Sequence, residues 1–169
     1  MRASILIVED HDTLRKALRQ WLEVAFPCCY VLEAASGEEA LPLVRARAPH
    51  VVIMDIGLPG MSGIEATRRI KSSLPATHVV ILTMYEDEAS RAAAARAGAS
   101  AYVVKRTMEI DLLPVVATLL PGQKEPETKN CERSTSSFPA SPPKQPSIPK
   151  LLPAIRGVVK VQPWVSRKN

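Results

Sequence analysis

The residues from Val51 to Met54 form an unbroken apolar run that ends at a single acidic residue, Asp55. Four consecutive apolar residues without polar alternation are typical of a short strand buried on both faces, as in a parallel sheet covered by helices. The segment from Gly57 to Gly63 contains three glycines and a proline, which indicates a loop. Since ligands bind at the carboxyl edge of open α/β sheets, we expect Asp55 to lie at a functional edge.

Strand-like and helix-like segments alternate along the first 120 residues. The expected strands are residues 5–8, 29–34, 51–54, 79–82 and 101–104, and the expected helices lie at about 13–25, 37–47, 64–73, 86–97 and 107–120. Alternation of this kind predicts an α/β fold with a doubly wound, five-stranded parallel sheet and helices on both faces.

Local signals mark the ends of the expected helices. Asp12 or Thr13 can cap the first helix, and Thr107 can cap the last one. Two prolines are out of place, because Pro42 and Pro114 fall inside expected helices. An interior proline costs a helix roughly 3 kcal/mol, so we expect local irregularity at both positions.

The composition changes after residue 120. Residues 1–120 hold 13 basic and 14 acidic side chains, a net charge of −1, whereas residues 121–169 hold 9 basic and 3 acidic side chains, a net charge of +6. Nine of the 15 prolines also fall in the last 49 residues. We therefore expect one domain at 1–120 and a Pro/Ser/Lys-rich basic tail at 121–169, disordered because it has too few apolar groups to offset the entropy of ordering.

The sequence shows no signal for a membrane span or for secretion. No run approaches 18 apolar residues, and the apolar segment after Met1 is too short for a signal peptide. The three cysteines, Cys28, Cys29 and Cys131, have the spacing of neither a disulfide framework nor a metal site. We expect a soluble, cytoplasmic protein without membrane contacts.

Polar side chains fall at the ends of four of the five expected strands. Glu9 and Asp10 follow the first strand, Asp55 the third, Thr83 the fourth and Lys105 the fifth. Packed carboxylates repel one another unless a cation is present, and Mg²⁺ prefers carboxylate oxygens and water. An ammonium and a hydroxyl beside a free carboxylate can bind an anionic oxygen. The constellation favours a site that receives a phosphoryl group, because such transfer depends mainly on positioning and charge neutralisation.

Four motifs at these positions resemble the receiver domain of bacterial two-component response regulators. They are ILIVED at 5–10, MDIGLPGMSG at 54–63, LTM at 82–84 and AGASAYVVK at 97–105. Their wording is most similar to the NarL/FixJ subfamily, whose members have LuxR-type output domains. The resemblance covers residues 3 to about 120, and no helix-turn-helix output domain is recognisable after it.

The resemblance implies a flavodoxin-like sheet with the order 2-1-3-4-5 and a magnesium-dependent phosphoacceptor. Asp55 would accept a phosphoryl group from a sensor histidine kinase. The metal ligands would be Glu9, Asp10, Asp55 and the carbonyl of Gly57. The resemblance also permits a homodimer and implies a downstream protein target that the sequence does not identify.

The remaining roles implied by the resemblance belong to the last two strands. Thr83 and Lys105 would bind the phosphoryl group. Tyr102 would be the switch aromatic, which turns inward as Thr83 moves and alters a surface for protein contacts. This reading describes a switch rather than an enzyme, with at most self-catalysed phosphotransfer and autodephosphorylation.

Two other functions compete with this reading. A transcriptional regulator could use the basic tail to contact DNA, although the missing helix-turn-helix motif argues against DNA binding. An aspartate-nucleophile phosphatase would use a similar site, but haloacid-dehalogenase-like hydrolases need a second acid two residues after the nucleophile, where Gly57 stands. His11 could be a ligand or proton carrier, and a local hydrogen bond is the favoured interpretation.

Overall fold

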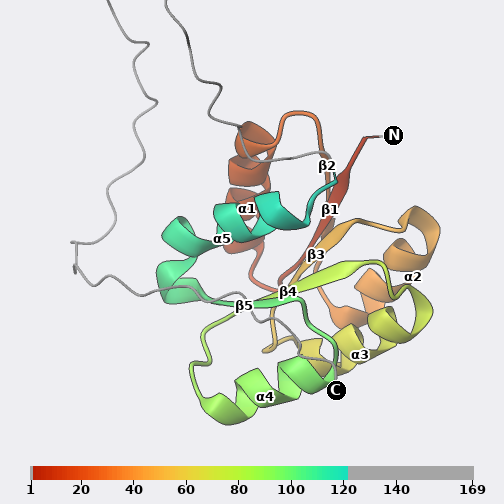
Figure 1. Ribbon diagram of the computed structural model, residues 1–169, viewed down its shortest axis with the longest axis vertical. Coiled ribbons are helices and arrows are strands. Elements are labelled where there is room, and N and C mark those ends of the chain that lie inside the picture. Colours follow the sequence, from red (N-terminus) through yellow and green to blue (C-terminus); the bar gives the residue numbers. More distant parts are fainter. Residues whose placement is uncertain (1, 122–169) are drawn as a thin grey trace, which may run out of the picture. The chain divides into compact units, whose positions relative to one another are not determined.

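The computed structural model describes residues 2–121, which form a parallel β-sheet with helices on both faces (Figure 1). The strands are β1 (Ser4–Val8), β2 (Tyr30–Ala34), β3 (Val51–Met54), β4 (His78–Thr83) and β5 (Ala101–Val104). The helices are α1 (Asp12–Ala25), α2 (Gly37–Arg47), α3 (Gly63–Ser73), α4 (Glu88–Arg96) and α5 (Met108–Leu119), and a 3₁₀ turn, η1 (Lys105–Thr107), precedes α5.

The strand order is β2-β1-β3-β4-β5, and every neighbouring pair is parallel. This confirms the flavodoxin-like order implied by the resemblance. The order reverses at β1, which has β2 on one side and β3 on the other. Ligands of doubly wound sheets bind outside the carboxyl ends of the strands at such a reversal, so the ends of β1 and β3 are where a site is expected.

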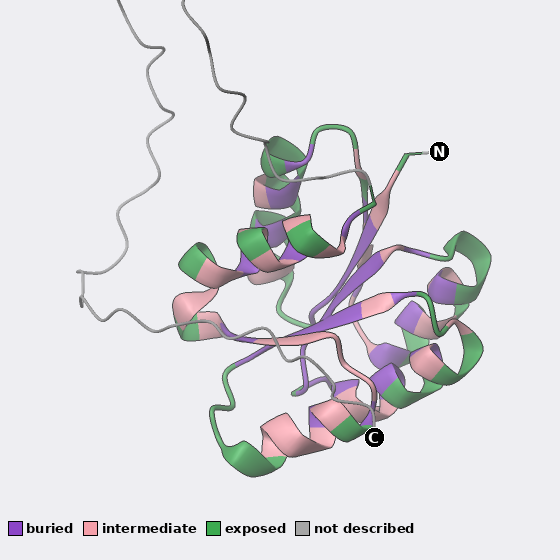
Figure 2. Cartoon of the chain, viewed as in Figure 1, coloured by how far each residue is buried: buried purple, intermediate pink, exposed green. Residues whose placement is uncertain are grey.

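Two apolar clusters hold the helices against the sheet, one on each face. Along β1, Ile5 and Ile7 join the cluster that packs against α1 and α5, whereas Leu6 and Val8 join the cluster beneath α2, α3 and α4. Figure 2 shows the sheet as the most buried layer, and all four residues of β3 are buried. The apolar run at 51–54 is therefore explained by burial on both faces.

One expected helix cap is wrong, and another is right in position but lacks a capping bond. At α1 the N-cap is His11, whose Nδ1 accepts from the N–H of Leu14 at 3.3 Å, and Asp12 and Thr13 are already helical. The structure thus confirms a local hydrogen bond for His11. At α5, Thr107 is the N-cap residue as expected, but it makes no side-chain capping bond, and its hydroxyl instead donates to the carbonyl of Val104 at 3.3 Å.

Pro42 and Pro114 lie inside α2 and α5, as expected, and both helices continue past them. Both prolines are exposed, and so are Glu38 and Ile110, the residues four positions earlier whose carbonyls lose a helical partner. Water can reach these carbonyls on the solvent side, which limits the cost of each proline.

Two further predictions concern the C-terminal tail and membrane spans. From residue 122 on, the predicted basic tail lies outside the described residues, and so does the prediction of its disorder. In the described part, none of the helices combines the length and the apolar character needed to cross a bilayer.

The start of α3 packs unusually close to the end of β3. The N–H of Gly63 donates to the carbonyl of Ile56 at 3.1 Å. A Cβ atom added to Gly63 would lie 1.8 Å from the backbone oxygen of Asp55, which no side chain can satisfy without moving the backbone. Glycine at this position lets the loop fold back on Asp55 and fix its place.

Replacing Gly63 with alanine should therefore destabilise the fold, although alanine normally favours a helix. Overpacking of this kind costs about 1–3 kcal/mol, measured as the free energy of urea-induced unfolding. Gly57→Ala is the control, because its added Cβ would come no closer than 3.8 Å to the Tyr85 ring, an ordinary contact. Equal stability of the Gly63→Ala variant and the wild type would contradict the steric argument.

Candidate functional site

Asp55 is the first residue after β3 and lies at the carboxyl edge of the sheet. Its backbone N–H donates to the carbonyl of Val8 at 3.0 Å, which holds the end of β3 against β1. Its side chain is buried, and Oδ1 accepts from the N–H of Gly57 at 3.2 Å. The carboxylate is therefore a fixed group rather than a solvated loop acid.

Lys105 follows β5 and reaches back over the end of β4 to this carboxylate. Its Nζ donates to Oδ2 of Asp55 at 2.5 Å and lies 2.8 Å from Oε2 of Glu9. The Lys105 side chain is only 12% exposed, so these contacts form in a largely water-excluded place. The structure thus joins Lys105, Asp55 and Glu9 in one cluster, as predicted from three separate strand ends.

Burial and pairing shift the proton affinities of Glu9 and Lys105. Burial is the main reason that the pKa of Glu9 lies above its usual 4.5; Lys105 partly offsets this shift, and the charge of Asp55 adds to it. Burial is the largest single influence on the pKa of Lys105 and would lower it, but the hydrogen bonds to Asp55 and Glu9 and the negative charges of both acids together outweigh burial and raise the pKa. The ammonium is therefore firmly protonated and compensates the two buried acids.

Three acids at this edge could hold a metal ion. Glu9, Asp10 and Asp55 each offer a carboxylate oxygen, and these oxygens lie within 4.8 Å of one another. Glu9 and Asp55 are buried while Asp10 is exposed, so the cluster faces water on the Asp10 side. A set of hard oxygen donors open to water fits Mg²⁺, which keeps several waters when bound. A role for the Gly57 carbonyl stays a prediction.

Thr83 and Tyr102 are linked through the backbone of Tyr85. Thr83 ends β4 and is fully buried, and its Oγ1 accepts from the N–H of Tyr85 at 3.5 Å. The Tyr102 hydroxyl donates to the carbonyl of Tyr85 at 2.8 Å. The Arg91 guanidinium stacks over the Tyr102 ring at 4.6 Å from its centroid. Sequence reasoning missed Tyr85 and Arg91, since neither position carries a motif.

Glu38, in the first turn of α2, is another residue that sequence reasoning missed. Its Oε1 accepts from the N–H of Met61 at 2.8 Å, which ties α2 to the loop after Asp55. Hydrogen bonds from the backbone N–H groups of Glu38 and Met61 hold the pKa of Glu38 below its usual value. In the sequence Glu38 is one of two acids opening a helix, and no spacing rule connects it with position 61.

Fold and site together define a doubly wound α/β protein with an acidic cluster, a lysine and a threonine at the carboxyl edge of its sheet. Comparison with known proteins supplies the family. Residues 5–117 match the response regulator receiver domain, and the chain belongs to this family.

Several relatives are response regulators. The chain is 33% identical over 121 residues to the response regulator UvrY of Escherichia coli O6:H1, covering 72% of this chain and 56% of the relative. It is also 33% identical to the response regulator GacA of Pseudomonas protegens over 120 residues, covering 71% and 56%. The chain thus spans about half the length of these curated relatives.

A solved structure supports the subfamily as well as the fold. The crystal structure of a LuxR-family two-component response regulator from Aurantimonas sp. SI85-9A1 is similar, with a TM-score of 0.65 and 38% identity, covering 70% of this chain and 84% of that one. The resemblance to LuxR-type regulators is confirmed for the receiver. The prediction that no output domain follows concerns residues outside those described.

The direction of the Glu9 shift can be tested by titrating the side-chain carboxyl carbons by NMR. Glu9 should titrate above 4.5, and higher still in Lys105→Met, which removes the neighbouring positive charge. Because folded Glu9 keeps its proton to a higher pH than the unfolded chain does, its ionisation should lower the free energy of unfolding as the pH rises above 4.5.

Glu38 is the internal control for this titration, because its pKa is shifted in the opposite direction. Both carboxyls appear in the same spectra, so an error in sample pH would move them together. A Glu9 carboxyl that titrates below 4.5 would contradict the conclusion that burial outweighs its pairing with Lys105.

Proposed function

We propose that this chain is a phosphorylation-controlled switch in which Asp55 accepts a phosphoryl group from a sensor histidine kinase. The observation that carries the proposal is the contact of Lys105 Nζ with both Asp55 and Glu9 beside a third acid, Asp10. Membership of the receiver family supports it. In keeping with that family we place this function in the cytoplasm.

The described residues divide the work of phosphotransfer. Glu9, Asp10 and Asp55 would hold Mg²⁺ together with the Gly57 carbonyl, and the metal when bound neutralises charge on the transferring group. The Asp55 carboxylate attacks phosphorus, a P–O bond forms, and the P–N bond to the histidine of the kinase breaks. Lys105 already lies against Asp55 Oδ2, so its ammonium is placed to donate to a new phosphoryl oxygen.

The link from Thr83 to Tyr102 supports a role for both in switching. If the Thr83 hydroxyl turns to donate to the phosphoryl group, it gives up its long contact with the N–H of Tyr85. The segment after β4 is then free to move. Because the Tyr102 hydroxyl donates to the Tyr85 carbonyl in this segment, Tyr102 is coupled to that movement. Tyr102 would reorient, changing the surface near α4 and β5 that a downstream protein or a second copy of the chain could contact.

The two alternatives gain no support from the described residues. Gly57 has no side chain that could protonate a leaving group, which a phosphatase acting on external esters would need at that position. The basic tail proposed to contact DNA lies outside the described residues from residue 122 on. We expect no turnover of an external substrate.

The phosphoacceptor assignment predicts that Asp55→Asn abolishes labelling. Intact-protein mass spectrometry after incubation with acetyl phosphate and Mg²⁺ should show one added phosphoryl group on the wild type and none on the variant. Chelation of Mg²⁺ should suppress labelling of the wild type, because the acid cluster then lacks its counter-charge.

Asp111→Asn is the matched control, since Asp111 is an α5 carboxylate outside the acid cluster. This variant should be labelled like the wild type. If Asp55→Asn were labelled to the same extent as the wild type, Asp55 would not be the phosphoacceptor.

A further inference from the structure

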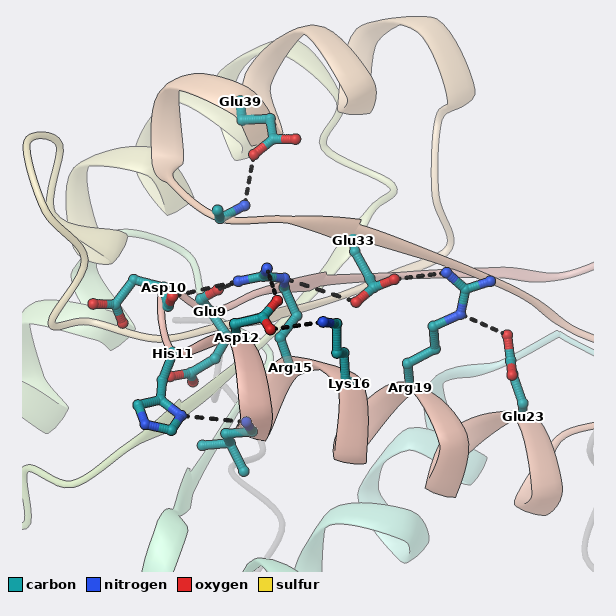
Figure 3. Close-up of polar contacts among 12 residues, drawn as sticks. Glu9, Asp10, His11, Asp12, Arg15, Lys16, Arg19, Glu23, Glu33 and Glu39 are labelled. Atoms are coloured by element: carbon teal, nitrogen blue, oxygen red, sulfur yellow. Dashed lines mark hydrogen bonds and ion pairs between the residues drawn. The ribbon is translucent and has the colours of Figure 1, made fainter.

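The guanidinium of Arg15 binds the loop that carries Glu9 and Asp10 (Figure 3). Its Nη1 donates to the backbone carbonyl of Glu9 at 2.7 Å and reaches the carbonyl of Asp10 at 3.4 Å. Its Nη2 donates to Oδ1 of Asp12 at 2.8 Å. One side chain, 15% exposed, thus contacts two residues between β1 and α1 and the first residue of α1.

These carbonyls lie where regular structure supplies no donors. β1 ends at Val8 and α1 begins at Asp12, so the Glu9 and Asp10 carbonyls belong to neither the sheet nor the helix. Among the backbone bonds of the described residues, none is donated to either carbonyl. Arg15 supplies the missing donors, and hydrogen bonds from a charged group are stronger than those between neutral groups.

The geometry of two adjacent acids makes this contact functionally relevant. In an extended chain, successive side chains point to opposite faces, which would send the Glu9 and Asp10 carboxylates apart. Their oxygens nevertheless lie within 4.8 Å of each other and of Asp55. The chain must therefore bend between them, and the bend is where Arg15 binds the backbone.

Arg15 is itself held from β2 and along α1. Its Nε lies 3.7 Å from Oε1 of Glu33, and Oε2 of Glu33 accepts from Nη1 of Arg19 at 2.6 Å. Arg19 in turn donates through Nε to Glu23 at 2.8 Å. Figure 3 shows these alternating charges running along α1 toward the loop. The guanidinium thus has the Glu33 carboxylate on one side while it binds the loop on the other.

We propose that Arg15 is a positioning residue for the magnesium site, an inference that rests on the proposed function. It holds the bent main chain at Glu9 and Asp10 so that both carboxylates project toward Asp55. It contacts neither the metal nor the phosphoryl group. Its positive charge also offsets part of the repulsion among the three acids.

Lys16 separates this role from simple stabilisation of α1. Lys16 Nζ pairs with Oδ2 of Asp12 at 2.7 Å, an ion pair comparable to that of Arg15 with the same carboxylate. The described contacts of Lys16 include no loop carbonyl. Lys16→Met therefore removes an ion pair in the first turn of α1 and leaves the hydrogen bonds of Arg15 to the loop carbonyls intact.

The test measures Mg²⁺ affinity of the full chain by isothermal titration calorimetry. Arg15→Met should weaken binding about tenfold or more, as loss of a partner that orients metal ligands typically does. Arg15→Lys should also weaken it, because an ammonium cannot reproduce the planar fork of the guanidinium. Lys16→Met should bind Mg²⁺ like the wild type.

Two further readouts distinguish positioning from loss of the site. In Mg²⁺-free protein, hydrogen exchange at the loop amides of residues 9–11 should accelerate in Arg15→Met and not in Lys16→Met. With acetyl phosphate, the Mg²⁺ concentration for half-maximal labelling should rise in Arg15→Met, while the maximal rate at saturating Mg²⁺ should stay near that of the wild type.

Wild-type Mg²⁺ affinity in a folded Arg15→Met variant would overturn the inference. If that variant does not fold, Arg15→Lys and Glu33→Gln decide, and wild-type affinity in both would overturn it equally. Absence of Mg²⁺ binding and labelling in the wild type would instead refute the proposed function, so the two failures are distinguishable.

Discussion

The ammonium of Lys105, placed between the carboxylates of Asp55 and Glu9, is the interaction on which the site depends. Taking ions out of water costs several kcal/mol each unless their charges are paired, and both acids are buried. Glu9 follows β1, Asp55 follows β3 and Lys105 follows β5, so the pairing needs the ends of three parallel strands at one edge. Because β4 lies between β3 and β5, the Lys105 side chain passes over the end of β4, where Thr83 is located, to reach Asp55.

This pairing prepares the site for a change of charge. With all groups ionised, the three acids and Lys105 carry a formal charge of −2, which a divalent cation would cancel. Phosphorylation would replace one negative charge on Asp55 with about −1.5 to −2. Further donors would have to meet the added charge, and the buried Thr83 hydroxyl at the end of β4, the strand beside β3, is a candidate. The pairing of Lys105 with Asp55 and Glu9 is therefore the set of contacts that a phosphoryl group on Asp55 would change.

The sequence was informative where one local property decides the structure. Apolar runs predicted the strands, and the charged residues after three of them predicted the Glu9, Asp55 and Lys105 cluster. Strand order came from the resemblance, because pairing between distant strands leaves no mark in a single sequence. The cap at His11 was missed because the neighbouring Asp12 and Thr13 are both residue types that favour the N-cap position. The path of the loop decides which of the three side chains faces the free N–H groups of α1. The contact of Glu38 with Met61 joins elements 23 residues apart and follows no spacing rule.

The two sides of the site differ in how firmly they are held, and this difference would give the proposed switch a direction. On the β1 side, Arg15 makes charge-assisted contacts with the Glu9 carbonyl at 2.7 Å and with Asp12 at 2.8 Å. On the β4 side, Thr83 meets Tyr85 through one contact at 3.5 Å, at the limit of a hydrogen bond. Under the proposed function, a charge added at Asp55 would act on both sides, and the weaker contact would yield first. The β1 side would then keep its geometry while the segment after β4 moves, and the hydrogen bond from Tyr102 to Tyr85 would carry the change away from the acids.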